Sequence, residues 1–547
     1  MQTLKRVGWL VPAGLFGIPL LAALWLGVVE SSDAIAWRRL FADSQFLPAL
    51  TLSLRIGIVS TLIAGVLTMT IVTQAHGSAA WRPLQTGFAA MLALPHTAFA
   101  IGLALLCMPS GGIVRVFAWF AGWTSPPDVA TVQDPAGIAL TLALVLKEVP
   151  FLVWNVAAQL QRVGQGAEIE KQVQIAATMG YARRNAWARI VWPQLLPRLA
   201  LPLLAVWAYS VTVVDMALVL GPTRPPTLAV LAWQWLLDAD EAVNRQGAAA
   251  ALWLAVCVAA GALLAAMVWT LSRATLMACW TRGDRPGPGP RLDVSWRRLF
   301  QAVYVAVFAM LVFISFVGVW TFPSWWPTQW SVQAWQTALQ SGSTWGTTLV
   351  LALMAATTGL VLAVAWMETT PARWDARAAP AVFAPMLIPG VLLVSGLYQV
   401  ALHTGLDGTL AGIWIAHSVY AAPYALVALA PAYRSFDPRY EQAAFALGKG
   451  RLATLCRVKW PMLRAPLLAA FAVGFAVSVT QYLSTQFVGA GRHATVTTEA
   501  LTLASGGQRG LAAAFSLLQA LLPAIVFIAA RWLGQAQASR LRSSVAD

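Results

Sequence analysis

The chain has 547 residues, of which 59% are hydrophobic and only 10% are charged, and its mean hydropathy is +0.68. Soluble domains carry about a quarter charged residues, so this composition excludes a set of soluble domains. The net charge of +15 does not indicate nucleic-acid binding, because the basic residues lie in loops between apolar runs, as in membrane proteins.

Twelve apolar runs are each long enough to cross the hydrocarbon core of a bilayer, about 30 Å thick, as an α-helix. The first six lie near residues 8–29, 47–74, 85–108, 137–160, 199–220 and 247–270. The second six lie near residues 299–321, 345–367, 379–402, 408–431, 465–488 and 510–533. We therefore predict an all-α integral membrane protein with twelve transmembrane helices.

Basic residues cluster in three of the loops, which are residues 161–198, 271–298 and 434–464. With twelve spans these loops share one side of the membrane, and the positive-inside rule makes that side cytoplasmic. Both termini are then predicted to be cytoplasmic. Trp325 and Trp326 lie on the opposite side, where tryptophans fit an interfacial belt.

A segment rich in glycine and proline divides the chain near its middle. Residues 283–290 read Gly-Asp-Arg-Pro-Gly-Pro-Gly-Pro and lie between the sixth and seventh spans. Gly and Pro interrupt helices, so this composition favours a linker. We predict a first domain over residues 1–273, a cytoplasmic linker over residues 274–296 and a second domain over residues 297–547.

The two halves also repeat one another. Residues 174–227 align without a gap with residues 442–495, and the matches include Trp-Pro pairs and arginines that apolar bias alone would not align. Weaker echoes lie upstream: Pro95 and Gly102 mirror Pro389 and Gly396, and Thr51-Leu-Ser-Leu mirrors Thr348-Leu-Val-Leu. Two six-span halves of parallel topology suggest a pathway between them.

The loop between the fourth and fifth spans of each half carries the repeated motif. The first copy contains Gln174, Ala176, Ala177, Gly180 and Pro193, and the second contains Gln442, Ala443, Ala444, Gly448 and Pro461. The stretch from Gln to Gly predicts a short helix whose alanines let another surface approach closely. Gly permits a turn that a Cβ would hinder, and Pro suits the first turn of the next helix. Two such elements on one side predict docking of two copies of one partner.

This spacing resembles the EAA signature of binding-protein-dependent ABC transporter permeases, although Gln174 and Gln442 replace the usual Glu and Trp192 and Trp460 replace the usual Leu. The chain also looks like the fused, YnjC-type permeases, relatives of the thiamine and iron(III) permeases. The resemblance implies two MetI-like transmembrane domains in a bacterial inner membrane. It implies two identical ATPase subunits on the coupling loops, one periplasmic substrate-binding protein, and a thiamine-like or iron(III)-like solute. ATP is then bound by the ATPase, and this chain holds no cofactor.

Four polar residues inside apolar runs are candidates for the pathway lining: Lys147, Glu148, Asp215 and His417. Charges at a helix centre cost about 2.5–3.5 kcal/mol each on insertion scales, so they should face protein or water. Structural pairing with neighbouring spans is the alternative. Residues 111–120, outside the third span, predict a short interfacial helix or a contact for the binding protein.

Two other classes of function fit part of the sequence. An ion-coupled secondary transporter also suits twelve spans in two halves, but it leaves the duplicated loop unexplained. A membrane enzyme needs clustered catalytic residues, and the sequence shows no phosphate-binding loop, no catalytic constellation and no metal-ligand spacing. Its four cysteines are far apart.

Overall fold

The computed structural model describes residues 10–161, 165–283 and 295–546. The chain forms two compact units. The first, called here the 33–332 unit, is continuous in sequence. The second, called the 333–547 unit, also includes the N-terminal segment up to Ser32. Each unit is described by itself.

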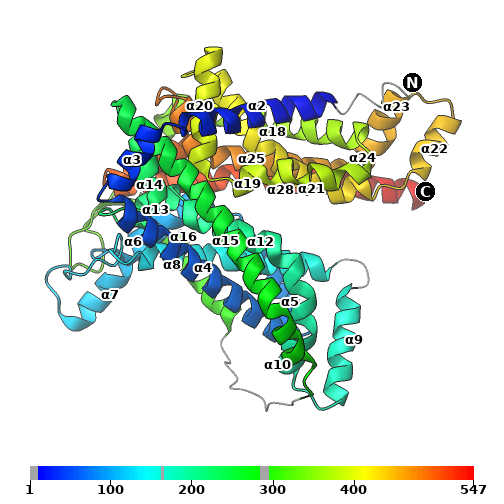
Figure 1. Ribbon diagram of the computed structural model, residues 1–547, viewed down its shortest axis with the longest axis horizontal. Coiled ribbons are helices and arrows are strands. Elements are labelled where there is room, and N and C mark those ends of the chain that lie inside the picture. The colour runs from blue at the N-terminus through cyan, green and yellow to red at the C-terminus, as the bar shows by residue number, and fades with distance from the viewer. Residues whose placement is uncertain (1–9, 162–164, 284–294, 547) are drawn as a thin grey trace. The chain divides into compact units, whose positions relative to one another are not determined.

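The 33–332 unit is helical apart from one short hairpin (Figure 1). Its elements are α3 (Ala34–Ala42), α4 (Phe46–Ala75), α5 (Trp81–Leu92), α6 (His96–Cys107), α7 (Gly112–Ala121), α8 (Ile138–Leu160), α9 (Gln165–Thr178), α10 (Arg183–Ala186), η1 (Trp187–Val191), α11 (Trp192–Leu195), η2 (Leu196–Leu199), α12 (Ala200–Thr212), α13 (Asp215–Leu220), α14 (Leu228–Leu236), α15 (Glu241–Thr281), α16 (Trp296–Ser315), β1 (Val317–Val319) and β2 (Gln329–Trp330). The two strands pair antiparallel, with Val317 opposite Trp330.

The 333–547 unit repeats much of this order. Its elements are α2 (Leu10–Glu30), α17 (Gln333–Gln340), α18 (Gly342–Thr369), η3 (Ala372–Trp374), α19 (Asp375–Leu387), α20 (Gly390–Thr404), α21 (Leu410–Arg434), α22 (Arg439–Ala446), α23 (Arg451–Thr454), η4 (Leu455–Lys459), α24 (Trp460–Met462), α25 (Arg464–Val479), α26 (Leu483–Val488), α27 (Val496–Ser505) and α28 (Arg509–Ala546).

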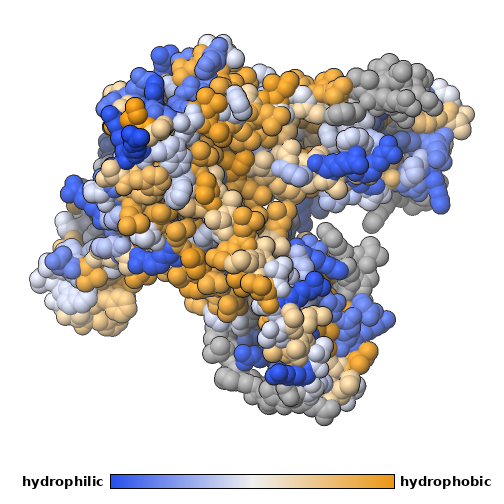
Figure 2. Space-filling model, viewed as in Figure 1, coloured by the Kyte–Doolittle hydropathy of each residue, from blue (hydrophilic) through white to orange (hydrophobic). Residues whose placement is uncertain are grey.

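Within the described residues, ten helices are long and apolar enough to cross a membrane, and two bent helix pairs bring the number to twelve. Figure 2 shows hydrophobic side chains over the middle of the helical bundles and hydrophilic ones toward their ends. Exposed apolar side chains on helices long enough to span are what a lipid-facing surface requires. The prediction of an all-α integral membrane fold is confirmed, and the predicted twelve spans are the upper end of the ten to twelve that the helices allow.

The third span of each half is broken at a proline. Residues 85–108 form α5 and α6, which are separated at Pro95, and α6 together with α7 makes the candidate span His96–Ala121. Residues 379–402 form α19 and α20, which are separated at Pro389 and bent by 99°. Pro lacks an N–H and disfavours helical geometry in the residue before it, so both breaks follow from the sequence.

The first helix of each sequence half packs with the helices of the other half. In the 33–332 unit, α16 lies against α6, and in the 333–547 unit, α2 lies against α20. A Cβ at Gly102 would meet Val307 at 2.7 Å, and one at Gly396 would meet the carbonyl oxygen of Ala23 at 1.8 Å. The equivalent glycines Gly102 and Gly396 therefore allow these two helices to pack closely. The compact units do not coincide with the two halves of the sequence.

Several helix ends differ from the predicted span and linker ends. Helix α15 continues to Thr281, so the predicted linker 274–296 begins inside a helix, and its residues 284–294 lie outside the described residues. The seventh span ends at Ser315, and the chain then enters the β1–β2 hairpin. The fifth and eleventh spans break after Thr212 and Val479, inside the repeated Ser-Val-Thr segment.

The alignment of the segments that begin at Thr51 and Thr348 also needs a shift in register. Ser53 Oγ accepts the backbone N–H of Leu228 at 2.8 Å, and Thr348 Oγ1 accepts that of Val496 at 2.9 Å. Leu228 and Val496 are equivalent in the repeat. Ser53, rather than Thr51, is therefore the structural counterpart of Thr348.

Candidate functional site

The repeated motif forms two similar loops, called here the first loop (residues 165–195) and the second loop (residues 439–462). Each begins with an exposed helix, α9 or α22, that starts earlier than the motif's Gln. Each helix ends at the motif's Gly, because Gly180 has φ +85° and Gly448 has φ +75°. These are left-handed conformations that Gly adopts without the penalty of a Cβ.

The hydrogen bonds at both turns are those of a Schellman motif. In the first loop, the N–H of Tyr181 donates to the carbonyl of Ala176 and that of Gly180 to Ala177, each at 3.0 Å. In the second loop the same two bonds run from Lys449 to Ala444 and from Gly448 to Phe445, also at 3.0 Å. The orphan carbonyls at the end of each helix are thereby satisfied.

Each loop returns through a π-helical turn. The turns η1 and η4 occupy equivalent positions in the repeat, and Pro193 and Pro461 follow in the first turn of α11 and α24. A π-turn inserts one residue in the helical ladder and is often found at functional sites. Since it occurs in both copies, it is a feature of the motif.

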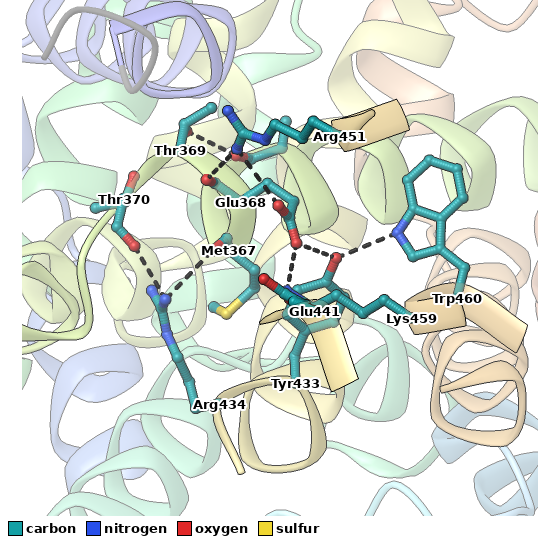
Figure 3. Close-up of polar contacts among 11 residues, drawn as sticks. Met367, Glu368, Thr369, Thr370, Tyr433, Arg434, Glu441, Arg451, Lys459 and Trp460 are labelled. Carbon is teal, nitrogen blue, oxygen red and sulfur yellow. Dashed lines mark hydrogen bonds and ion pairs between the residues drawn. The ribbon is translucent and has the colours of Figure 1, made fainter. Parts of the chain in front are cut away.

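The second loop is fixed to the end of α18 by a network around Glu368 (Figure 3). Lys459 Nζ donates to Glu368 Oε1 at 2.6 Å, and the hydroxyl of Tyr433 donates to the same oxygen at 2.8 Å. Arg451 donates to the Glu368 backbone carbonyl at 3.0 Å, and Trp460 Nε1 donates to the Tyr433 hydroxyl at 3.2 Å. Charge-assisted bonds of this kind are roughly twice as strong as neutral ones.

Lys459 also connects this network to the exposed helix. Its Nζ lies 2.8 Å from Glu441 Oε1 on α22, while its own side chain is only 11% exposed. Nearby, Arg434 makes a bidentate contact with Asp375, at 2.7 Å and 2.8 Å, and donates to the carbonyl of Thr370. The ends of α18, α19 and α21 are therefore held together beneath the loop.

The first loop is fixed to the end of α4 by a different set of hydrogen bonds and ion pairs. Arg183, equivalent to Arg451, donates to the carbonyl of His76 and lies 3.5 Å from Glu170 on α9. Glu170 Oε2 is also 3.5 Å from the His76 ring. Burial lowers the pKa of His76 and Glu170 opposes that shift, while Arg183 lowers the pKa further. Trp192, equivalent to Trp460, donates to Thr73 Oγ1 at 2.9 Å.

The motif alanines divide between two faces. Ala176 and Ala444 are 3% and 6% exposed, so they pack against this chain itself. Gln174, Ala177, Gln442 and Ala443 are exposed. Large apolar side chains, which the motif did not mark, share this exposed surface: Ile175 at 60%, Met179 at 56%, Phe445 at 47% and Leu447 at 79%. Exposed apolar side chains on a polar loop are typical of an interaction site.

A pocket lies beside the first loop. It has a volume of about 310 Å³ and lies between α9, η1 and the end of α15. Ile175, Met179 and Ile190 supply apolar walls, and Arg189 and Arg282 supply positive charge. The apolar face of α9 therefore borders a concave surface.

The four candidate pathway residues are all inside the helical bundles. Lys147, 1% exposed, donates to the carbonyl of Leu94 at 2.6 Å, at the break between α5 and α6. Glu148 is 5% exposed beside it. Asp215 begins α13 after the break in the fifth span. Both ring nitrogens of His417 are bonded, to Ser478 at 2.8 Å and Thr485 at 2.9 Å. A role in the pathway stays a prediction for all four.

The side-chain contacts that fix the two loops to α4 and α18 were largely not predicted from the sequence. Glu368, Tyr433, Lys459, Glu441, His76 and Glu170 were not singled out. The repeated Arg183/Arg451 and Trp192/Trp460 pairs were the available signal. In the described part of the chain, His, Cys, Asp and Glu side chains form no group of three that could hold a metal ion.

Two comparisons with known proteins agree with each other. Residues 357–540 match the family model described as the binding-protein-dependent transport system inner membrane component. The inner membrane ABC transporter permease protein YnjC of Escherichia coli (strain K12) is 33% identical to the chain over 534 residues, which cover 96% of each protein.

Proposed function

Because the chain belongs to the inner-membrane permeases of binding-protein-dependent ABC transporters, we propose that its two loops each dock one ATPase subunit. As a permease, the chain is a multi-pass transport protein, and association with an ATPase and a binding protein follows from its family. The observation that carries the docking proposal is the duplication. Both loops combine an exposed helix with apolar side chains, a Schellman turn at Gly, and an arginine that hydrogen-bonds a carbonyl at the end of a long helix.

The hydrogen bonds and ion pairs that fix the loops to long helices suit them for transmitting force. A loop that must move transmembrane helices when its partner moves needs stiff connections to them. Lys459 bridges α22 to the end of α18, and Arg183 bridges α9 to the end of α4. Two equivalent loops favour two identical ATPase subunits, which bind the ATP, so this chain needs no cofactor. The loop side, and both termini with it, are then cytoplasmic.

The solute is proposed from the resemblance to fused permeases: a thiamine-like or iron(III)-like solute handed over by one periplasmic binding protein. Lys147, Glu148, Asp215 and His417 are the ionisable side chains proposed to lie near its path. The first three belong to the first half, and the repeat places Leu483 at the position of Asp215. Buried ionisable groups inside a membrane bundle are expensive and usually functional, which supports this proposal.

The docking proposal is tested by charging the exposed apolar surface. Met179→Asp and Leu447→Asp, combined in one chain, change side chains that are 56% and 79% exposed, so the fold is retained. The chain is purified from its host in mild detergent, and its partners are identified by mass spectrometry. We expect an ATPase with the native chain and its loss from the double variant.

The matched control is Leu237→Asp with Leu410→Asp, exposed positions at the opposite ends of the units. This control should keep the ATPase. Retention of the ATPase by the loop variant would refute docking at the loops. Uptake by vesicles that hold the native chain alone, without ATP, would instead favour an ion-coupled transporter. The binding protein that co-purifies identifies the solute, by mass spectrometry for an organic ligand and by metal analysis for iron.

A further inference from the structure

An aromatic surface in the 33–332 unit is formed by α7 and the β1–β2 hairpin. In Figure 1, α7 projects from the bundle at the end away from α9 and α10. Its exposed side chains are Ile113 (40%), Val116 (38%), Phe117 (61%), Trp119 (64%) and Phe120 (76%). The hairpin adds Val319 (44%), Trp325 (51%), Trp326 (59%) and Trp330 (50%). We call these side chains the aromatic platform.

Arg115 holds the two parts of the platform together. It lies on α7 but is only 3% exposed. Its guanidinium donates to the carbonyls of Trp320 at 3.0 Å, Thr321 at 2.8 Å and Ser324 at 2.9 Å, and it lies 3.9 Å from the centre of the Trp320 ring. Such a set of bonds and a cation–π contact fix the hairpin against the helix. The platform is therefore a built surface.

The inward position of Arg115 leaves the outer face without charge. It is the one charged residue in the ten residues of α7, and it is turned toward the hairpin. Trp119 reaches across to Trp325, with their ring centres 6.0 Å apart. What remains exposed on α7 is apolar or aromatic along its length.

The platform continues the apolar stripe of α16. Val305 (67% exposed), Phe308 (42%) and Val312 (37%) recur at helical spacing along one face of that helix, and Phe316 (37%) follows directly after its end. The stripe leads into the hairpin, where Phe313 contacts the rings of Trp320, Trp326 and Trp330. In a protein of the inner membrane, such a stripe on a spanning helix faces lipid.

The platform lies at the end of the unit opposite the first loop. Phe300, near the start of α16, packs on Phe88 of α5 with their ring centres 5.4 Å apart, and Trp81 at the start of α5 packs on His76 beside the first loop, so α16 begins on the loop's side. The 20 residues of α16 then span about 30 Å. The hairpin at its far end reaches the other face of the bilayer.

We propose that the aromatic platform inserts into the interfacial layer of the leaflet on the side away from the loops, so that its partner is the lipid surface. Trp and Tyr prefer this layer, and an apolar helix face lying there is buried by about 5–10 Å. A docked protein is the less favoured occupant, because protein interfaces carry a polar rim that the exposed face of α7 lacks. The proposal stands whether or not the loops bind an ATPase.

The test measures depth in the bilayer. A nitroxide is attached to Phe120→Cys, and in a second variant to Phe117→Cys, in a full-length chain whose four native cysteines are replaced by alanine. The chain is placed in lipid nanodiscs, and collisions with oxygen and with a water-soluble nickel chelate are compared. Both labels should lie about 5–10 Å below the phosphate level.

Two reference labels calibrate the result. Val305→Cys on the stripe of α16 should report lipid, and Ala239→Cys, in the exposed loop between α14 and α15, should report water. Chelate access at Phe120 and Phe117 equal to that at Ala239 would overturn the proposal. It would equally be overturned if the two labels became protected only after the binding protein was added.

Discussion

Lys459 and Glu441 lie 2.8 Å apart, ammonium to carboxylate, and connect the π-turn of the second loop to its exposed helix. The same ammonium lies 2.6 Å from Glu368 at the end of α18. One side chain therefore joins the proposed docking helix to a transmembrane helix. In the first copy Val191 stands at this position of the repeat, and Arg183 and Glu170 make the connection instead.

Removing the charge of Lys459 should loosen the second loop. Lys459→Met leaves Glu368 and Glu441, 15% and 29% exposed, without their shared partner. We expect a loss of about 1–3 kcal/mol in the free energy of unfolding, seen as a lower Tm and faster hydrogen exchange in α22. Lys449→Met, an exposed lysine in the same loop, is the control and should change little. Equal Tm values for the two variants would show that the network does not hold the loop.

The left-handed turn at Gly448 gives a second prediction. Gly448→Ala introduces a Cβ at φ +75° where no atom lies within 4 Å, so any cost comes from the backbone alone. That cost is about 1–2 kcal/mol for an L-residue in this region. Gly450→Ala, two residues on, has φ −69° and equally open space, so it adds no left-handed strain, and at the N-cap of α23 it should leave the end of α22 unchanged. Hydrogen exchange at the end of α22 distinguishes the two variants.

Local features of the fold could be predicted from the sequence. Apolar length indicated the spans, the gap-free repeat indicated equivalent loops, and Gly180 and Gly448 stand where each helix turns. These features depend on residues close together in the chain, so composition and spacing suffice.

Long-range packing could not be predicted in this way. Nothing near Glu368 in the sequence indicates that Lys459 and Tyr433 will reach it, because these residues meet only when α18, α21 and the second loop pack together. The placement of α2 against α20 has the same origin. The breaks after Thr212 and Val479 interrupt apolar runs that contain no proline at those points, so no local signal indicates them.

The close approach of α2 and α20 predicts a pair of glycine variants with opposite effects. Gly396→Ala places a Cβ 1.8 Å from the carbonyl oxygen of Ala23, so the two helices must separate. We expect destabilisation of about 1–3 kcal/mol, as for other overpacked contacts. Gly346→Ala, on an exposed face of α18 with no atom within 4 Å, should stabilise by up to about 1 kcal/mol. A Tm that falls for Gly346→Ala as much as for Gly396→Ala would contradict this packing.

His76 makes the first loop sensitive to pH. Burial holds the pKa of His76 below its ordinary value, with Glu170 opposing the shift and Arg183 adding to it. The neutral ring is thus favoured in the folded state. Its contribution is present above the unfolded pKa of about 6.5 and is lost as the pH falls from there through the folded-state pKa. The Tm of the native chain should therefore fall between about pH 7.5 and about pH 5.5.

His76→Gln removes this contribution, so the Tm difference between native and variant should shrink at the lower pH. His403→Gln, at an exposed histidine, is the control and should keep a constant difference. A gap between native and His76→Gln that widens on acidification would mean that the charged ring is favoured, held by Glu170 at 3.5 Å.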